Sequence, residues 1–275
     1  MNAYTLDICH ILIVIILGII EGITEFFPIS STSHIIIFSN IFQIEINETL
    51  MLNTFMQCGT SLSILLYFKD TFITLLYSIL HVKRQSENTC NLSCNNILIS
   101  IFPIALLGLY FHKYMKHLFN PTSILLSLIL GSILLMLSEI FKKIKTHQNK
   151  NINLYRSFTI GCFQCLALLP GFSRSCSTIS IGILIGLNQS VATHFSFIIS
   201  VPIFLGATLL DIINNIHTMS IYNMFVLLIG FLSSFITSSF CIKKCFKIIN
   251  VCSFVSFIIY RLVLSLIIYL FFYHY

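Results

Sequence analysis

The sequence predicts an all-α polytopic membrane protein with about six transmembrane helices and two re-entrant helix-turn-helix hairpins, arranged as inverted repeats. Three observations lead to this fold class. Of the 275 residues, 57% are hydrophobic and only 9% are charged, and the mean hydropathy is +0.95. A soluble domain carries about 25% charged residues, so a water-soluble fold could not cover this much apolar surface. Apolar segments recur from end to end, and two of them are interrupted by polar residues.

Most of the apolar segments are single-crossing candidates. A helix needs about 20 mostly apolar residues to span the hydrocarbon core of a bilayer. The segments lie near residues 11–27, 50–68, 97–111, 123–141, 157–169, 177–187, 194–213, 222–241 and 252–273. We expect a single integral membrane domain over residues 1–275, with a first repeat over about 1–150 and a second over about 151–275.

Two segments are each broken by a polar turn. The first runs into Glu21, Glu25 and Pro28 and then a Ser-Ser-Thr-Ser-His run, and the second, Gly161 to Leu187, is broken by Pro-Gly-Phe-Ser-Arg-Ser. Broken segments at corresponding positions of two halves indicate a site between inverted repeats. Non-helical backbone at membrane depth is tolerated only where protein buries it or where it lines a water-filled cavity. We therefore expect two re-entrant hairpins whose polar tips meet.

Basic residues predict the orientation in the membrane. They gather in the stretches Lys69 to Arg84, Lys142 to Arg156 and Lys243 to Lys247, which we assign to cytoplasmic loops because such loops carry an excess of Lys and Arg. Six crossings then alternate, the first hairpin enters from outside, the second enters from inside, and both termini lie outside. Lys113 and Lys116 would fall in an outer loop and count against this topology. We attribute the net charge of +6 to topology and expect no nucleic-acid partner.

A pair of carboxylates opens the first polar turn. Glu21 and Glu25 are four residues apart and therefore share one face of a helix. A charged carboxylate at the centre of a membrane helix costs about 2.5–3.5 kcal/mol on insertion scales. Helix capping or hydrogen bonding between helices is the structural alternative. We favour a site for a divalent cation, Mg²⁺ or Ca²⁺, because these cations choose carboxylate oxygens.

Hydroxyl groups and a histidine follow the carboxylates. Ser30, Ser31 and Thr32 come soon after Pro28, where one hydroxyl serves as an ordinary helix N-cap. His34 lies three residues after Ser31, a spacing that brings an imidazole and a hydroxyl to one helical face. This arrangement is the one that activates a serine nucleophile.

An arginine marks the second polar turn. Arg174 lies between Ser173 and Ser175 where a new helix is expected to begin, and backbone N–H groups at such a helix start bind anions. Its guanidinium can hold phosphate oxygens through two parallel hydrogen bonds. A salt bridge to one of the two glutamates is the structural alternative. Together, the carboxylates, the hydroxyl with its histidine and the arginine indicate phosphate chemistry in a membrane.

The stretches EGITEFFPISSTSH and LPGFSRSCSTISIG resemble the paired signatures of the bacterial undecaprenyl-diphosphate phosphatase family, the bacitracin-resistance type. The resemblance covers nearly the whole chain. It implies hydrolysis of undecaprenyl diphosphate to undecaprenyl phosphate and inorganic phosphate, which recycles the lipid carrier for cell-wall synthesis and confers bacitracin resistance. It also implies interdigitated inverted repeats, a divalent cation, and a place in the bacterial cytoplasmic (inner) membrane with the active site open to the periplasmic side.

The resemblance also assigns roles by position. It gives the acidic metal-binding motif to Glu21 and Glu25, the catalytic serine and histidine to Ser31 and His34, and the phosphate-binding arginine to Arg174. The other polar residues of the two tips are implied in substrate binding: Ser30, Thr32, Ser173, Ser175 and Thr178. The implied partners are the polyprenyl diphosphate lipid and the bilayer, and the sequence leaves both a monomer and a homodimer open.

Two other classes compete with this interpretation. A lipid phosphatase of the phosphatidic-acid-phosphatase type would carry a histidine six residues after Arg174, but residue 180 is a serine. A transporter has the same anatomy of inverted repeats and broken helices, yet a transport site gives no reason for Ser31 beside His34. Within the favoured class, the sequence does not choose between a phosphoserine intermediate and direct attack by water.

Overall fold

The computed structural model describes residues 8–79, 92–111, 118–144, 151–215 and 220–273, and these ranges contain helices and no β-strand. The predicted all-α fold class is confirmed. Within these ranges, five helices are long and apolar enough to cross a membrane. They are α5 (Cys94–Phe111), α7 (Pro121–Ile144), α10 (Gln189–Asn215), α11 (Ile221–Val251) and α12 (Val255–Tyr273).

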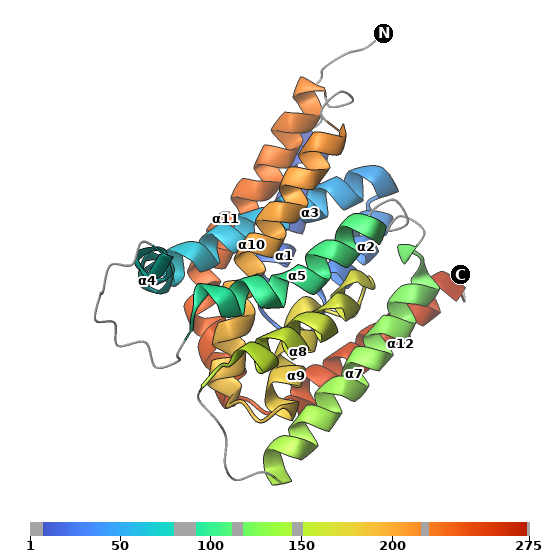
Figure 1. The fold of residues 1–275 in the computed structure, drawn as a ribbon. Helices are drawn as coiled ribbons and strands as arrows, with labels where there is room; N and C mark the ends of the chain where they lie inside the picture. The colour runs from blue at the N-terminus through green and yellow to red at the C-terminus, as the bar shows by residue number, and fades with distance from the viewer. Residues whose placement is uncertain (1–7, 80–91, 112–117, 145–150, 216–219, 274–275) are drawn as a thin grey trace.

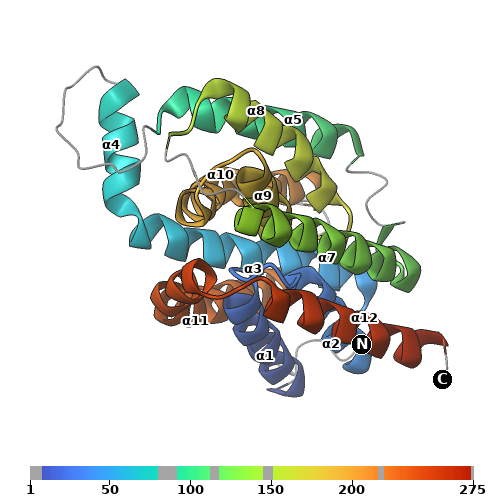
Figure 2. The same ribbon diagram turned by 90° about the horizontal axis from the view of Figure 1, so that it is seen from below.

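The sixth expected crossing corresponds to α3 (Ile46–Tyr67), a helix of 22 residues that carries Asn, Gln, Ser and Thr along its length. This helix packs against α1 (Ile8–Thr24), α10 and α11. In Figure 2 it runs through the middle of the bundle, between α10 and α11. Because other helices rather than lipid cover much of its surface, α3 does not need to be apolar on every face.

Each broken segment forms two short helices joined by a non-helical tip (Figure 1). In the first, α1 ends at Thr24 and α2 (Ser31–Ile41) begins after the tip. In the second, α8 (Leu154–Gln164) continues as the 3₁₀ helix η2 (Cys165–Leu168), and α9 (Arg174–Leu184) follows. The helices α2, α8 and α9 have 11 residues each. That length is about 16 Å, too short for a hydrocarbon core of about 30 Å, so the two predicted hairpins are present.

One basic stretch is helical and is not a loop. Lys243, Lys244 and Lys247 lie inside α11, so the prediction of a loop there was wrong. Their side chains are exposed, whereas Cys245 and Ile249 on the same turns are buried. The helix continues because it still has an apolar face to pack, while the long lysine side chains extend away from it.

The other two basic stretches are described only in part. The helix α4 (Lys69–Ile79) covers the beginning of the first, and the last turn of α7 begins the second. Arg84, Lys113 and Lys116 lie outside the described residues.

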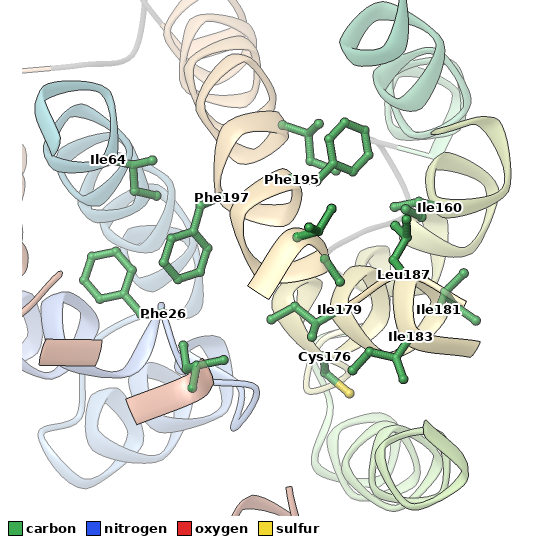
Figure 3. Close-up of a cluster of buried hydrophobic side chains, with 14 of the residues drawn as sticks. Phe26, Ile64, Ile160, Cys176, Ile179, Ile181, Ile183, Leu187, Phe195 and Phe197 are labelled. Atoms are coloured by element: carbon green, nitrogen blue, oxygen red, sulfur yellow. The ribbon is translucent and has the colours of Figure 1, made fainter. Parts of the chain in front are cut away.

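A hydrophobic cluster packs both hairpins against α10. The ring centroid of Phe26, from the first tip, lies 5.6 Å from that of Phe197 on α10, and Ile64 of α3 lies beside this pair (Figure 3). In the second hairpin, Cys176 and Ile179 of α9 belong to the same cluster. Because one cluster contains residues of both hairpins, its packing fixes the two tips relative to each other.

Candidate active site

The two hairpin tips have a similar local geometry. The residues that precede α2 and α9, Ser30 and Ser173, have positive φ angles of 70° and 74°. Each serine Oγ accepts a hydrogen bond of 3.3 Å from the backbone N–H three residues further on. A non-glycine residue with positive φ is uncommon and stores strain. Each tip therefore uses a strained serine N-cap, and the next residue, Ser31 or Arg174, takes the first helical position.

One carboxylate joins the two tips. Arg174 Nη2 donates to Glu25 Oε1 at 3.1 Å, and Ser31 Oγ donates to Glu25 Oε2 at 2.5 Å. All three side chains are buried. The ion pair that was the structural alternative for Arg174 therefore forms, and it brings the arginine of the second hairpin to the serine of the first.

Arg174 makes further contacts with α10. Its Nη1 donates to both the backbone oxygen and the Oγ of Ser196, at 2.9 and 3.0 Å. The Thr178 hydroxyl lies 2.7 Å from Ser196 Oγ, and the guanidinium carbon lies 5.1 Å from the centroid of the Phe204 ring. The buried Nε of Arg174 has no hydrogen-bond partner among the described residues. The two terminal nitrogens of the guanidinium are therefore bonded to protein groups, and its Nε is still available as a donor.

The remaining predicted polar residues lie around this contact. Ser175 Oγ donates to the backbone oxygen of Phe27 at 3.1 Å, which adds a second link between the tips. Ser173 Oγ lies 3.0 Å from Ser175 Oγ. Thr32 is half-buried in the first turn of α2. The two tips thus meet as the broken segments predict.

Glu21 is a fully buried carboxylate for which the described residues provide no hydrogen-bond partner to either oxygen. Gly18 and Gly22 let α1 approach α11 closely, since a Cβ at Gly22 would lie 2.9 Å from the backbone oxygen of Ser234. A buried carboxylate without a partner is expensive, so this position requires a compensating cation or a proton.

A divalent cation fits these donors. The backbone N–H of Glu25 donates to the backbone oxygen of Glu21 at 3.0 Å, so the two residues are one helical turn apart and their carboxylates lie on one side of α1. Within the described ranges, no three His, Cys, Asp or Glu side chains gather as a complete cage. Mg²⁺ commonly binds through one or two carboxylates and takes its other ligands from water and substrate phosphates. The pair Glu21 and Glu25 matches that pattern.

His34 does not form the expected pair with Ser31. Its Nδ1 lies 2.7 Å from the backbone oxygen of Ser30, and its Nε2 lies 2.6 Å from the hydroxyl of Tyr260. A carbonyl can only accept, so Nδ1 carries the proton of the neutral ring and Nε2 accepts from the tyrosine. The imidazole bonds to Ser30, one helical turn back, and not to Ser31. The group in contact with the Ser31 hydroxyl is the Glu25 carboxylate.

Three residues at this site did not emerge from the sequence: Ser196, Tyr260 and Arg261. Ser196 and Tyr260 each lie among several other hydroxyl residues of their helices, so neither stands out in the sequence. Arg261 did have a signal, because an arginine inside the apolar segment 252–273 indicates a buried functional group. It is fully buried and contacts both tips.

The fold and the site together define a polytopic membrane protein with an ionisable cluster between two re-entrant hairpins. The family model described as bacitracin resistance protein BacA matches residues 14–267. The chain therefore belongs to the BacA family, and the family expected from the two signature stretches is confirmed.

Curated relatives match over most of their length. The chain is 53% identical over 260 residues to an undecaprenyl-diphosphatase of Buchnera aphidicola subsp. Baizongia pistaciae, covering 94% of this chain and 96% of the relative. It is 47% identical over 266 residues to an undecaprenyl-diphosphatase of Buchnera aphidicola subsp. Acyrthosiphon pisum (strain APS), covering 96% and 98%. An undecaprenyl-diphosphatase of Baumannia cicadellinicola is 36% identical over 270 residues, with the same coverage of 96% and 98%.

Proposed function

We propose that this protein hydrolyses undecaprenyl diphosphate to undecaprenyl phosphate and inorganic phosphate. Its relatives at 36–53% identity carry the name undecaprenyl-diphosphatase. The observation on this chain that carries the proposal is the double contact of Glu25, which holds the Ser31 hydroxyl and the Arg174 guanidinium together between the tips. A hydroxyl, a base and an arginine in contact are the groups that phosphoryl transfer needs.

Substrate binding follows from the two helix starts and the arginine. The N-termini of α2 and α9 both lie at the tips, and helix N-termini favour anions. Arg174 has an unused Nε donor for a phosphate oxygen. The polyprenyl chain of the substrate belongs with the apolar helices, so the diphosphate enters the polar tips while its tail stays in the hydrophobic phase.

The contacts of Ser31 support a nucleophilic role. Its Oγ attacks the terminal phosphorus while its proton passes to Glu25 Oε2, the oxygen to which it donates at 2.5 Å. The bond from phosphorus to the bridging oxygen breaks, undecaprenyl phosphate leaves, and water then hydrolyses the phosphoserine. Protonation of Glu25 weakens its hold on Arg174, so the guanidinium is released to the phosphoryl oxygens as their charge develops. Direct attack by water is the competing route.

We further propose that Glu21 and Glu25 hold a divalent cation, Mg²⁺ or Ca²⁺. The unpartnered oxygens of Glu21 support this assignment. A bound cation would neutralise negative charge on the phosphate oxygens. Glu25 has both oxygens engaged by protein groups, so Glu21 is the ligand with the more available carboxylate.

The protein is a multi-pass membrane protein with bacterial relatives. We propose that it lies in the cytoplasmic (inner) membrane with its active site open to the periplasmic side, where the released carrier lipid returns to cell-wall synthesis. Bacitracin resistance, which the family description names, fits an enzyme that acts on the diphosphate form of this lipid.

Phosphate release in detergent tests the proposed function. Micelles have no second compartment, so a transporter would produce no signal, whereas a hydrolase releases phosphate from undecaprenyl diphosphate in proportion to the amount of protein. Purified protein that releases no phosphate with Mg²⁺ or Ca²⁺ present would contradict the proposal.

His34→Asn tests the role of the histidine. The asparagine amide can donate to the Ser30 oxygen in place of Nδ1, but it cannot act as a base. Since Glu25 lies beside Ser31, we expect kcat to stay within about tenfold of wild type, a change of about 1.4 kcal/mol. A loss as large as that of a nucleophile variant would show that His34 is the base after all.

Arg174→Lys separates an ion pair from a phosphate clamp. Lysine keeps the charge but loses the planar fork that reaches Glu25 and Ser196 together. We expect kcat/KM to fall by about ten- to a hundredfold, because a charge-assisted hydrogen bond is worth about 1.5–3 kcal/mol. Arg156→Lys, at a half-buried arginine bonded to the backbone oxygen of Asn151, is the matched control and should behave as wild type. Normal kinetics in Arg174→Lys would exclude the phosphate clamp and leave the ion pair with Glu25 as the role of Arg174.

A further inference from the structure

Arg261 of α12 is the largest fully buried side chain among the described residues. Its Nη1 donates to the backbone oxygen of Pro28 at 3.2 Å, and its Nη2 donates to that of Gly171, also at 3.2 Å. The same guanidinium donates to the backbone oxygens of Ser127 and Leu128 on α7 at 3.1–3.3 Å. One side chain thus connects α12, α7 and both hairpin tips.

The two tip contacts occupy equivalent positions. Pro28 lies two residues before the N-cap Ser30, and Gly171 lies two residues before the N-cap Ser173. Arg261 therefore holds the same carbonyl of each tip from a single planar group. The two residues that follow the caps, Ser31 and Arg174, are the ones that meet on Glu25.

The charge of Arg261 has no carboxylate partner within the described part of the chain; the atoms that accept its hydrogen bonds are carbonyl and hydroxyl oxygens. Burying a charged group costs several kcal/mol, and an apolar side chain of similar size often stabilises a fold at least as well. What an apolar side chain cannot do is fix two separate backbone turns in one geometry. The guanidinium can, because its donors form a rigid fork.

We propose that Arg261 is a positioning residue for the hydrolysis, which sets the spacing of Ser31 and Arg174 by holding the two tips together through Pro28 and Gly171. This inference rests on the proposed function. Ser31 must reach the phosphorus that Arg174 neutralises, and a misplacement of about 1 Å in such a pair can lower the rate about a hundredfold. Arg261 itself needs no contact with the substrate.

Arg261→Lys gives the first test, with phosphate release from undecaprenyl diphosphate in detergent as the assay. Lysine cannot hold Pro28 and Gly171 with the same fork, so we expect kcat to fall about a hundredfold while KM changes less than about threefold. Glu139→Gln is the stability control. Glu139 accepts hydrogen bonds from Ser253 Oγ and the Phe254 N–H at the start of α12, so this variant weakens the same helix about two turns from Arg261 and leaves the hydrogen bonds of Arg261 in place. It should melt earlier but keep its kcat per folded molecule.

Gly131→Ala gives a second test that keeps the arginine. A Cβ at Gly131 would lie 2.1 Å from Arg261 Nη2 and 3.0 Å from the backbone oxygen of Phe172, so it displaces the guanidinium from the tips. Gly206→Ala is the matched control, because a Cβ there meets nothing within 4 Å. We expect Gly131→Ala to lower kcat in folded protein and Gly206→Ala to match wild type. This pair decides the question if Arg261→Lys fails to fold.

The outcomes separate cleanly. Wild-type kcat in folded Arg261→Lys, or equal kcat in Gly131→Ala and Gly206→Ala, would overturn the positioning role and leave the proposed function intact. A loss of activity in Arg261→Lys that is explained fully by a smaller folded fraction, as expected for Glu139→Gln, would also overturn the positioning role. If wild-type protein releases no phosphate, the proposed function fails and this inference fails with it.

Discussion

Replacing Ser31 with alanine is expected to lower kcat for phosphate release by about a thousandfold or more, which corresponds to about 4 kcal/mol of transition-state stabilisation. The substitution removes the hydroxyl that donates to Glu25 Oε2, so both the nucleophile and its proton transfer are lost. The variant should still fold, with a lower melting temperature, because one hydrogen bond to a charged group contributes about 1.5–3 kcal/mol to stability. Phosphate release and the melting temperature in detergent measure the two effects.

Ser39→Ala is the matched control for this variant. Ser39 lies on the same helix, α2, and is also buried, but its hydroxyl has no partner among the described residues. It should keep wild-type turnover. A phosphorylated protein trapped during turnover of the wild type would identify Ser31 as the nucleophile, and near-normal kcat in Ser31→Ala would exclude that role.

Glu21→Gln is expected to abolish the stimulation of turnover by Mg²⁺ or Ca²⁺ without lowering the melting temperature. The Glu21 oxygens have no hydrogen-bond partner among the described residues, so the neutral amide gives up no hydrogen bond there and removes one of two neighbouring negative charges. Wild-type protein should melt at a higher temperature in the presence of the cation, since a ligand at about 100 times its Kd stabilises the folded state by about 2.7 kcal/mol. The variant should show no such shift.

A third buried glutamate, Glu139, provides the contrast. Glu139 has hydrogen-bond partners at the start of α12, so Glu139→Gln should lower the melting temperature yet retain both the cation-dependent shift and the stimulation. A cation-dependent shift that persists in Glu21→Gln would remove the metal assignment. Treatment of the wild type with EDTA should reproduce the kinetic loss of the Glu21 variant.

The architecture was predictable because its signals are local and strong. Long apolar runs define membrane helices, and the two interrupted runs, with Pro28 and Pro170 at their breaks, gave the hairpins. The expected helix starts are confirmed, since Ser30 caps α2 and α9 begins at Arg174. The prediction of a loop at Lys243 to Lys247 was wrong. It relied on charge alone, whereas packing of the opposite face keeps that stretch of α11 helical.

Which polar residues meet at the two tips was predictable from the sequence, but the contacts between them were not. Sequence spacing brought Ser31 and His34 to one helical face, yet it could not tell that the imidazole bonds to the Ser30 oxygen one turn back. The partner of Ser31 is Glu25, six residues earlier, across a non-helical tip whose shape no helical spacing rule describes. Arg261 lies 233 residues from Pro28, and a contact at that separation depends on the tertiary fold alone.

The most direct test of the central claim is an experimental structure of the Ser31→Ala variant with undecaprenyl diphosphate bound. The variant should bind the lipid without turning it over. We expect the terminal phosphorus to lie between residue 31 and the Arg174 guanidinium, with the polyprenyl chain along the apolar helices and Arg261 still bonded to Pro28 and Gly171. A diphosphate bound away from the two tips, with Arg174 still paired only to Glu25, would contradict the account.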